Sequence, residues 1–276
     1  RLLILLMLIH GAIGAVQVAR HAPLGLAALG EIRFDPERSG TSVIQSGEMR
    51  WLRPYGLLPH PNMLAGIFVL GTLCAGAAAL DESNKRRWLY TAFFTFGIWM
   101  LLLSFSRSAW LATGAAGLAV LPWLIRSRAQ LHRSLPTLGA LLATGALFLA
   151  FYAPLLLARA GVGSENTEMR SIADRAVFTQ IAMTAIQRAP WQGLGVANYP
   201  WYAADYLWRF TDYDLRGDNV HHIGLLLWSE LGLIGLLLFF AAIGLSVRLA
   251  LDSIRCDPAP RTRVMLLAGA AAFLQI

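Results

Sequence analysis

Long apolar stretches dominate this sequence and limit what it can fold into. A helix of about 20 apolar residues crosses the hydrocarbon core of a bilayer, which is roughly 30 Å thick. Because 57% of the 276 residues are hydrophobic and only 14% are charged, we expect an all-α polytopic membrane protein. The predicted spans cover residues 2–18, 61–80, 88–106, 109–125, 135–157, 223–247 and 264–276. The sequence starts and stops inside apolar stretches and lacks an initiator Met, so we expect a single membrane domain, 1–276, that is part of a longer chain.

Basic residues orient the predicted spans. They gather in three short connections, which hold Lys85, Arg86 and Arg87; Arg126, Arg128 and Arg133; and Arg248, Arg255, Arg261 and Arg263. These connections share one side of the membrane in the predicted order of spans, and the positive-inside rule makes that side cytoplasmic. The long segments 19–60 and 158–222 and the turn at Arg107 then lie outside. Orientation explains the net charge of +7 better than nucleic acid does, so we expect no nucleic-acid partner.

Neither the cysteines nor the acidic residues indicate a metal or another cofactor. Cys74 lies in an apolar segment and Cys256 in a basic loop, and neither has a Cys or His partner at metal-ligand spacing. Asp212 and Asp214 match the D-x-D pattern of metal-dependent nucleotide-sugar enzymes. A three-residue match is weak, and nucleotide sugars are not normally found outside the cytoplasmic membrane. We therefore expect no disulfide, metal or cofactor.

The segment 158–222 is the part of the chain that most resembles a soluble protein. Ser171 and Asp174 resemble a capping box, and apolar residues then recur at helical spacing until Pro190. This predicts an amphipathic helix on the outer membrane surface. Arg188 would lie in its last turn, where a cation is favourable, and Arg175 in its first turn, where a cation is disfavoured. The position of Arg175 suggests either an anionic ligand or a pairing with Asp174.

An aromatic-rich run follows this helix and contains Trp201, Tyr202, Tyr206, Trp208, Phe210 and Tyr213. Trp and Tyr gather at membrane interfaces because their rings are amphipathic. Sugars also stack on such rings, so the run fits either role.

Polar residues also lie at the predicted outer ends of other spans. His60 and Asn62 flank Pro61, which suits the first position of a helix because it has no N–H to satisfy. The two polar residues either cap that helix or belong to an interfacial site. Arg107 joins two spans with almost no loop, so it either extends to the lipid headgroups or faces inward toward an anion.

The stretch 221–235 combines His221 and His222 with Glu230, Gly232 and Gly235 at the start of a predicted span. The positive end of a helix disfavours imidazolium and keeps a histidine in the form that accepts a proton. Glu230 would be costly in lipid, so we expect it to face protein or water. The two glycines would permit close helix packing.

Taken together, these residues resemble the O-antigen ligase family, which includes O-antigen polymerases and bacterial O-oligosaccharyltransferases. The resemblance rests on His221-His222 followed by Gly232-x-x-Gly235, on His60-Pro61-Asn62, on Ser106-Arg107-Ser108, and on Arg175 leading to Ala189-Pro190 and Gly193-Leu-Gly195. His222 departs from the family pattern, in which the residue after the histidine is a small amide or hydroxyl residue.

The resemblance implies a GT-C-like inverting glycosyltransferase of the bacterial inner membrane, with its site facing the periplasm. The enzyme would transfer a preassembled glycan from undecaprenyl pyrophosphate to a hydroxyl, most simply on the lipid A core. Arg107 and Arg175 would bind the pyrophosphate, because a guanidinium matches phosphate oxygens. His221 would deprotonate or orient the acceptor, and His222, Glu230, Arg188, His60 and Asn62 would support it.

Three other functions fit less directly. A polymerase would use a second lipid-linked glycan as acceptor, and an oligosaccharyltransferase would use a protein. A transporter of a polar substrate would need charged residues inside several spans, and the predicted spans contain only Glu230.

Overall fold

The computed structural model describes residues 2–38, 40–47, 49–81, 84–125, 128–159, 165–207, 220 and 222–256. The chain divides into two compact units. The first comprises Arg1–Ser164 with Leu251–Ile276, and the second comprises Glu165–Ala250.

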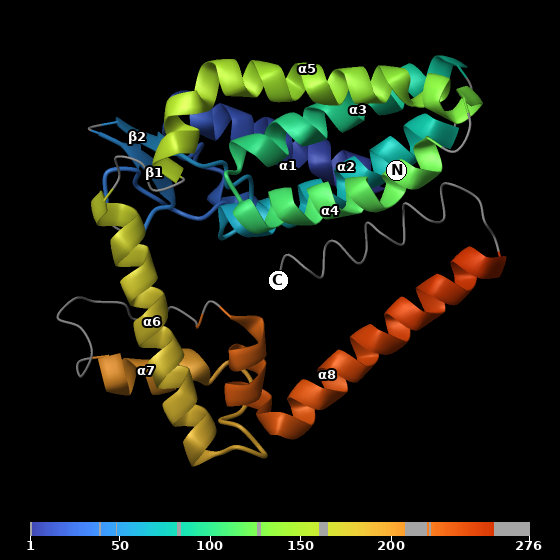
Figure 1. The fold of residues 1–276 in the computed structure, drawn as a ribbon. Coiled ribbons are helices and arrows are strands. Elements are labelled where there is room, and N and C mark those ends of the chain that lie inside the picture. The colour runs from blue at the N-terminus through green and yellow to red at the C-terminus, as the bar shows by residue number, and fades with distance from the viewer. Residues whose placement is uncertain are drawn as a thin grey trace. The chain divides into compact units, whose positions relative to one another are not determined.

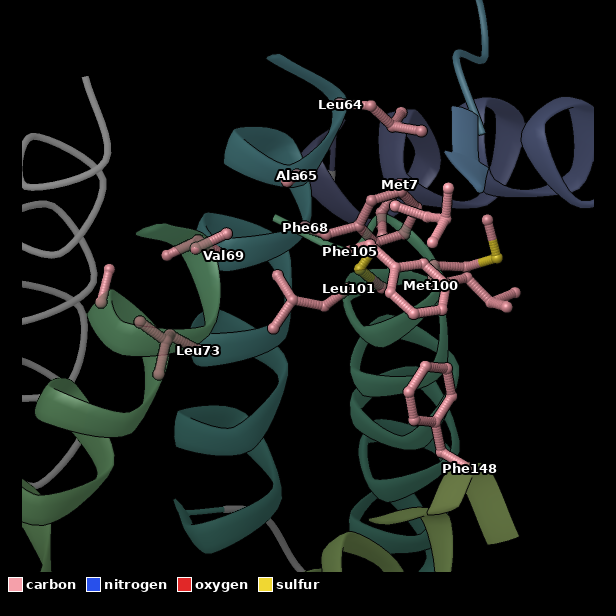
Figure 2. Close-up of a cluster of buried hydrophobic side chains, with 14 of the residues drawn as sticks. Met7, Leu64, Ala65, Phe68, Val69, Leu73, Met100, Leu101, Phe105 and Phe148 are labelled. Carbon is pink, nitrogen blue, oxygen red and sulfur yellow. The ribbon is translucent and has the colours of Figure 1, made fainter. Parts of the chain in front are cut away.

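The first unit contains five long helices, and Figure 1 shows them lying side by side. They are α1 (Leu2–Arg20), α2 (Pro61–Asp81), α3 (Asn84–Leu103), α4 (Arg107–Leu124) and α5 (Arg128–Arg159). Their core is apolar, with Phe68 of α2, Met100 of α3 and Phe148 of α5 each at most 2% exposed (Figure 2). Met7 of α1 joins the same cluster, so the helices share one continuous core.

In the described residues, four helices are long and apolar enough to cross a membrane. These are Leu2–Arg20, Pro61–Leu80, Leu131–Arg159 and Ile223–Leu249. The predicted spans 88–106 and 109–125 also form helices, namely α3 and α4. Lys85, Arg86 and Arg87 lie in the first turn of α3. The predicted span 264–276 lies outside the described residues.

The segment 19–60 contains more structure than a loop. It holds the short 3-10 helix η1 (Ala27–Leu29) and an antiparallel hairpin of β1 (Val43–Ser46) and β2 (Met49–Leu52), in which Ile44 pairs with Trp51. The structure is mostly helical and fits the expected all-α membrane protein, with one short hairpin that was not predicted. Strands of four residues are too short to give a clear alternating pattern in the sequence.

A buried amide fastens this segment to α1. The Gln17 side chain donates hydrogen bonds to Glu31 Oε1 at 2.7 Å and to the Gly56 carbonyl at 2.9 Å. Its own oxygen accepts the N–H groups of Tyr55 and Gly56. Burial opposes the charge on Glu31, but hydrogen bonds from Leu24 N–H, Gln17 and Leu26 N–H outweigh it and hold the pKa of this carboxyl below its usual value.

The second unit contains α6 (Glu165–Arg188), α7 (Tyr199–Leu207) and most of α8 (Ile223–Cys256). The predicted helix before Pro190 is present, but it starts at Glu165. The expected capping box at Ser171 is therefore wrong, because that residue lies inside the helix. Phe178 and Ile181 of α6 pack against Tyr199 and Ala203 of α7, and this packing fixes α7 on α6.

Candidate functional site

A chain of hydrogen bonds links the polar residues at one end of the first unit. His60 Nδ1 accepts the Asn62 N–H at 3.0 Å, and the His60 carbonyl accepts the Met63 N–H, so His60 caps α2. Asn62 Oδ1 accepts a bond of 2.7 Å from the Arg53 guanidinium. Arg53 is buried, and its Nε donates to the Ser104 carbonyl at 2.6 Å. The predicted residues His60 and Asn62 are thereby tied to the turn that carries Arg107.

That turn is as short as the sequence predicts, because α3 ends at Leu103 and α4 begins at Arg107. Phe105 adopts a positive φ of 49°, which an ordinary residue rarely does. Its fully buried ring packs against Phe148 and Trp110, with centroids 5.6 and 5.9 Å away. The core thus holds the turn in a conformation that the local sequence does not favour.

Arg107 is exposed at the first position of α4. The open N–H groups and the dipole of a helix start attract anions and disfavour a cation. The prediction that Arg175 lies in the first turn of its helix is wrong, because α6 begins ten residues before it. Arg107, by contrast, does lie at the start of its helix.

In the second unit, the loop 190–198 packs against a break in α8 (Figure 1). Gly232 has φ 70° and ψ −179°, which interrupts the helix. The freed carbonyls of Ser229 and Glu230 accept the N–H groups of Leu194 and Gly195, both at 2.8 Å. The Leu233 N–H donates to the Pro190 carbonyl at 2.9 Å. These backbone groups of the break and the loop therefore satisfy one another.

The break also explains why glycine occupies positions 193 and 232, which belong to the stretches that resemble the family. A Cβ atom on Gly232 would collide with the Trp191 backbone, and one on Gly193 would collide with the Glu230 backbone. Gly232 was expected to permit helix packing. That expectation is wrong, because Gly232 lets a loop approach the broken helix instead.

Glu230 of α8 contacts the first residue of α7 through its side chain. It is partly buried, and its Oε1 accepts the Tyr199 N–H at 3.1 Å. This contact confirms the expectation that Glu230 faces protein. It is favourable because a carboxylate stabilises a helix N-terminus. Tyr199 is fully buried and its hydroxyl donates to the Phe178 carbonyl at 2.7 Å. Tyr199 therefore connects α8 to α6 at a point one turn from Arg175.

Arg175 is exposed on α6. Within the described part of the chain it forms no ion pair with Asp174, whose Oδ1 is buried without a hydrogen-bond partner. The alternative that Asp174 holds Arg175 is therefore not supported. Arg175 therefore presents an exposed guanidinium on α6.

Arg188 ends α6 beside two tyrosines of α7. The rings of Tyr202 and Tyr206 stack with centroids 4.7 Å apart. Burial, followed by the neighbouring Tyr206, raises the pKa of the Tyr202 hydroxyl to about 12, although the Arg188 guanidinium acts in the opposite direction. Tyr202 is therefore a neutral hydrogen-bond donor at physiological pH.

His222 caps α8. Its Nδ1 accepts the Leu225 N–H at 3.3 Å, and its carbonyl accepts the Leu226 N–H at 3.0 Å. A neutral imidazole that accepts at Nδ1 carries its proton on Nε2, so in this state Nε2 donates rather than accepts. The predicted residues His221, Asp212 and Asp214 lie outside the described residues.

Sequence reasoning missed two residues of these networks. Arg53 was not among the candidate residues, although it stands seven residues before His60 and is followed by Pro54. Tyr199 was not among the candidate residues, although its place directly after the Gly193-Leu-Gly195-Val-Ala-Asn198 stretch was an available signal.

The apolar helices and the helix break filled by a loop define a multi-span membrane protein with polar networks at its helix ends. A family model described as O-antigen ligase matches residues 92–240, more than half of the chain. The chain therefore belongs to the O-antigen ligase family. It is a membrane glycosyltransferase of the O-antigen ligase or polymerase type, from the bacterial inner membrane. Comparisons with curated proteins and with solved structures gave no match.

Proposed function

We propose that this protein transfers a preassembled glycan from undecaprenyl pyrophosphate to a hydroxyl of the lipid A core, on the periplasmic side. The observation that carries the proposal is the family match over 92–240, which includes Arg107, Arg175 and the α8 break. The polar networks at helix ends give the proposal its chemistry. The donor supplies its own driving energy through the pyrophosphate linkage.

In the proposed reaction the acceptor oxygen attacks the anomeric carbon of the first sugar. The bond from that carbon to the pyrophosphate oxygen breaks, and the leaving group keeps the electron pair. Attack from the opposite face inverts the anomeric configuration. An arginine stabilises the negative charge on the leaving oxygen, because its planar fork forms two hydrogen bonds to phosphate.

Arg175 is our principal candidate for this arginine. It is exposed, and it lies one turn from Phe178, whose carbonyl is held by Tyr199. Arg107 is a separate candidate for binding phosphate, since it lies at a helix start in the first unit.

We assign the proton transfer to His221. The cap on α8 occupies His222 Nδ1 and leaves a proton on Nε2, so His222 would have to leave its cap to act as a base. His222 and Glu230 would then support the site by fixing the starts of α8 and α7.

The contact of Glu230 bears on the transporter alternative. The Tyr199 N–H already engages this carboxylate as a cap, and a cap is a structural role rather than a step on a substrate path. A transporter would need charged residues inside several spans, and the predicted spans contain only Glu230, which serves as this cap.

The test uses the full-length protein in detergent with a lipid-linked glycan and a lipid A core acceptor. We expect His221→Ala and Arg175→Gln to reduce transfer at least about 100-fold, the usual cost of losing a group that stabilises the transition state. Arg107→Gln tests the second arginine. Gln180→Ala, an exposed change on α6, should transfer like the wild type.

The acceptor distinguishes the related functions. Extension of the lipid-linked glycan without modification of the core would identify a polymerase, and modification of a protein would identify an oligosaccharyltransferase. Wild-type transfer rates in both His221→Ala and Arg175→Gln would refute the proposed site.

A further inference from the structure

A groove of about 390 Å³ lies between α1 and α3 in the first unit. Ile4, Leu5 and Leu8 of α1 line it together with Leu89 and Phe93 of α3. Leu5 and Leu89 are each 53% exposed, so the apolar walls are open at the surface. None of the residues discussed for glycan transfer lines this groove.

The packing of α1 on α3 places the groove toward the beginning of both helices. Met7 lies against Gly97, where an added Cβ atom would come within 3.1 Å of the Met7 sulfur. Ile4 and Leu5 precede Met7, and Phe93 precedes Gly97. The groove therefore extends from this close contact toward the N-terminal ends of the two helices.

Polar groups lie along the same α3 wall. Arg86 and Tyr90 line the groove, and Arg86 is exposed. Arg86 precedes Phe93 by seven residues, which corresponds to about 10 Å along a helix. An apolar wall of this length that ends in a guanidinium fits an amphiphile with an acyl chain and a phosphate.

The predicted orientation indicates which leaflet of the membrane would supply such a molecule. Lys85, Arg86 and Arg87 mark the cytoplasmic side by the positive-inside rule. Anionic lipids of the cytoplasmic leaflet are attracted to basic residues next to a span. The position of Tyr90 also suits the depth at which tyrosine meets the headgroups.

We propose that this groove binds one anionic glycerophospholipid of the cytoplasmic leaflet. Its phosphate contacts Arg86 and Tyr90, and one acyl chain lies along Leu5, Leu89 and Phe93. The site is independent of glycan transfer, so its test does not depend on the proposed reaction.

Native mass spectrometry of the full-length protein can test this site with added phosphatidylglycerol or phosphatidylcholine. We expect the wild type to retain one phosphatidylglycerol in preference to phosphatidylcholine. Arg86→Gln should weaken retention about fivefold, the effect of one basic residue at the membrane surface. Arg128→Gln removes an exposed arginine on the same predicted side that does not line the groove, and it should retain lipid like the wild type.

A second variant tests the groove without changing its charge. Leu5→Trp fills the apolar part, so it should also lose the lipid while the melting temperature is unchanged. Equal losses in Arg86→Gln and Arg128→Gln would show diffuse surface attraction and overturn the proposal. Full retention in Leu5→Trp would overturn it as well. A wild type that retains no phosphatidylglycerol would also overturn the proposal.

Discussion

At the scale of single residues, Arg53 is the clearest structural determinant of the first unit. Its guanidinium donates to the Ser104 carbonyl, to Ser42 Oγ at 2.8 Å and to Asn62 Oδ1. These partners come from the turn before α4, the segment before the hairpin and the start of α2. One buried side chain therefore holds three distant segments together.

We expect Arg53→Ala to destabilise the protein by about 3 kcal/mol or more, because it leaves several buried partners without a hydrogen bond. Arg53→Lys should recover only part of this loss, since an ammonium group lacks the planar fork. Thermal unfolding of the purified protein measures both changes.

The matched control is Arg38→Ala. Arg38 is exposed and pairs with Asp35 at 3.1 Å, and such surface pairs contribute at most about 1 kcal/mol. If Arg53→Ala melts no lower than Arg38→Ala, the hydrogen bonds of Arg53 do not stabilise this end of the unit.

At the scale of secondary-structure elements, the break in α8 makes a prediction about Gly232. An alanine at this position would hold a positive φ and would collide with the Trp191 backbone. The backbone conformation alone costs about 1–3 kcal/mol, and displacement of the loop 190–198 adds to it. We expect Gly232→Ala to lower the melting temperature and to abolish glycan transfer.

Gly244→Ala is the control for this change. Gly244 lies further along α8 with nothing within 4 Å of an added Cβ atom, and alanine favours a helix more than glycine does. This variant should fold and transfer normally. Equal melting temperatures for both variants would mean that α8 can continue as a regular helix through position 232.

The sequence predicted most elements by their apolar content but not their ends or interruptions. The helix before Pro190 was predicted, and its end at Arg188 is confirmed. Its start was missed because Ser171 and Asp174 imitate a cap, whereas the helix already begins at Glu165. Local patterns indicate where a helix can start, and they do not exclude an earlier start.

The break at Gly232 was missed for a different reason. The residues on either side of it are apolar and favour a helix, so nothing in the local pattern marks an interruption. Its cause lies in the backbone of the loop 190–198, whose hydrogen bonds replace those that α8 gives up. A contact between segments some 40 residues apart in sequence cannot be inferred from periodicity. The roles of Arg107, Arg175 and His221 stay predictions.

At the scale of the whole molecule, the family match establishes the class of reaction and leaves the orientation in the membrane as a prediction. The basic connections predict that segments 19–60 and 158–222 are outside and that the connection before α5 is inside. A periplasmic site requires this orientation. Single cysteines can test it in a variant of the full-length protein that lacks Cys74 and Cys256.

Three exposed positions suit this experiment and leave the charges unchanged. Ala28 lies in η1, Gln187 near the end of α6, and Ala129 at the start of α5. In intact spheroplasts a membrane-impermeant maleimide should label Ala28→Cys and Gln187→Cys but not Ala129→Cys. Permeabilisation should then expose Ala129→Cys. The reverse pattern would place Arg107 and the loop 190–198 in the cytoplasm, where a periplasmic acceptor cannot reach them, and would exclude ligation to the lipid A core at this site.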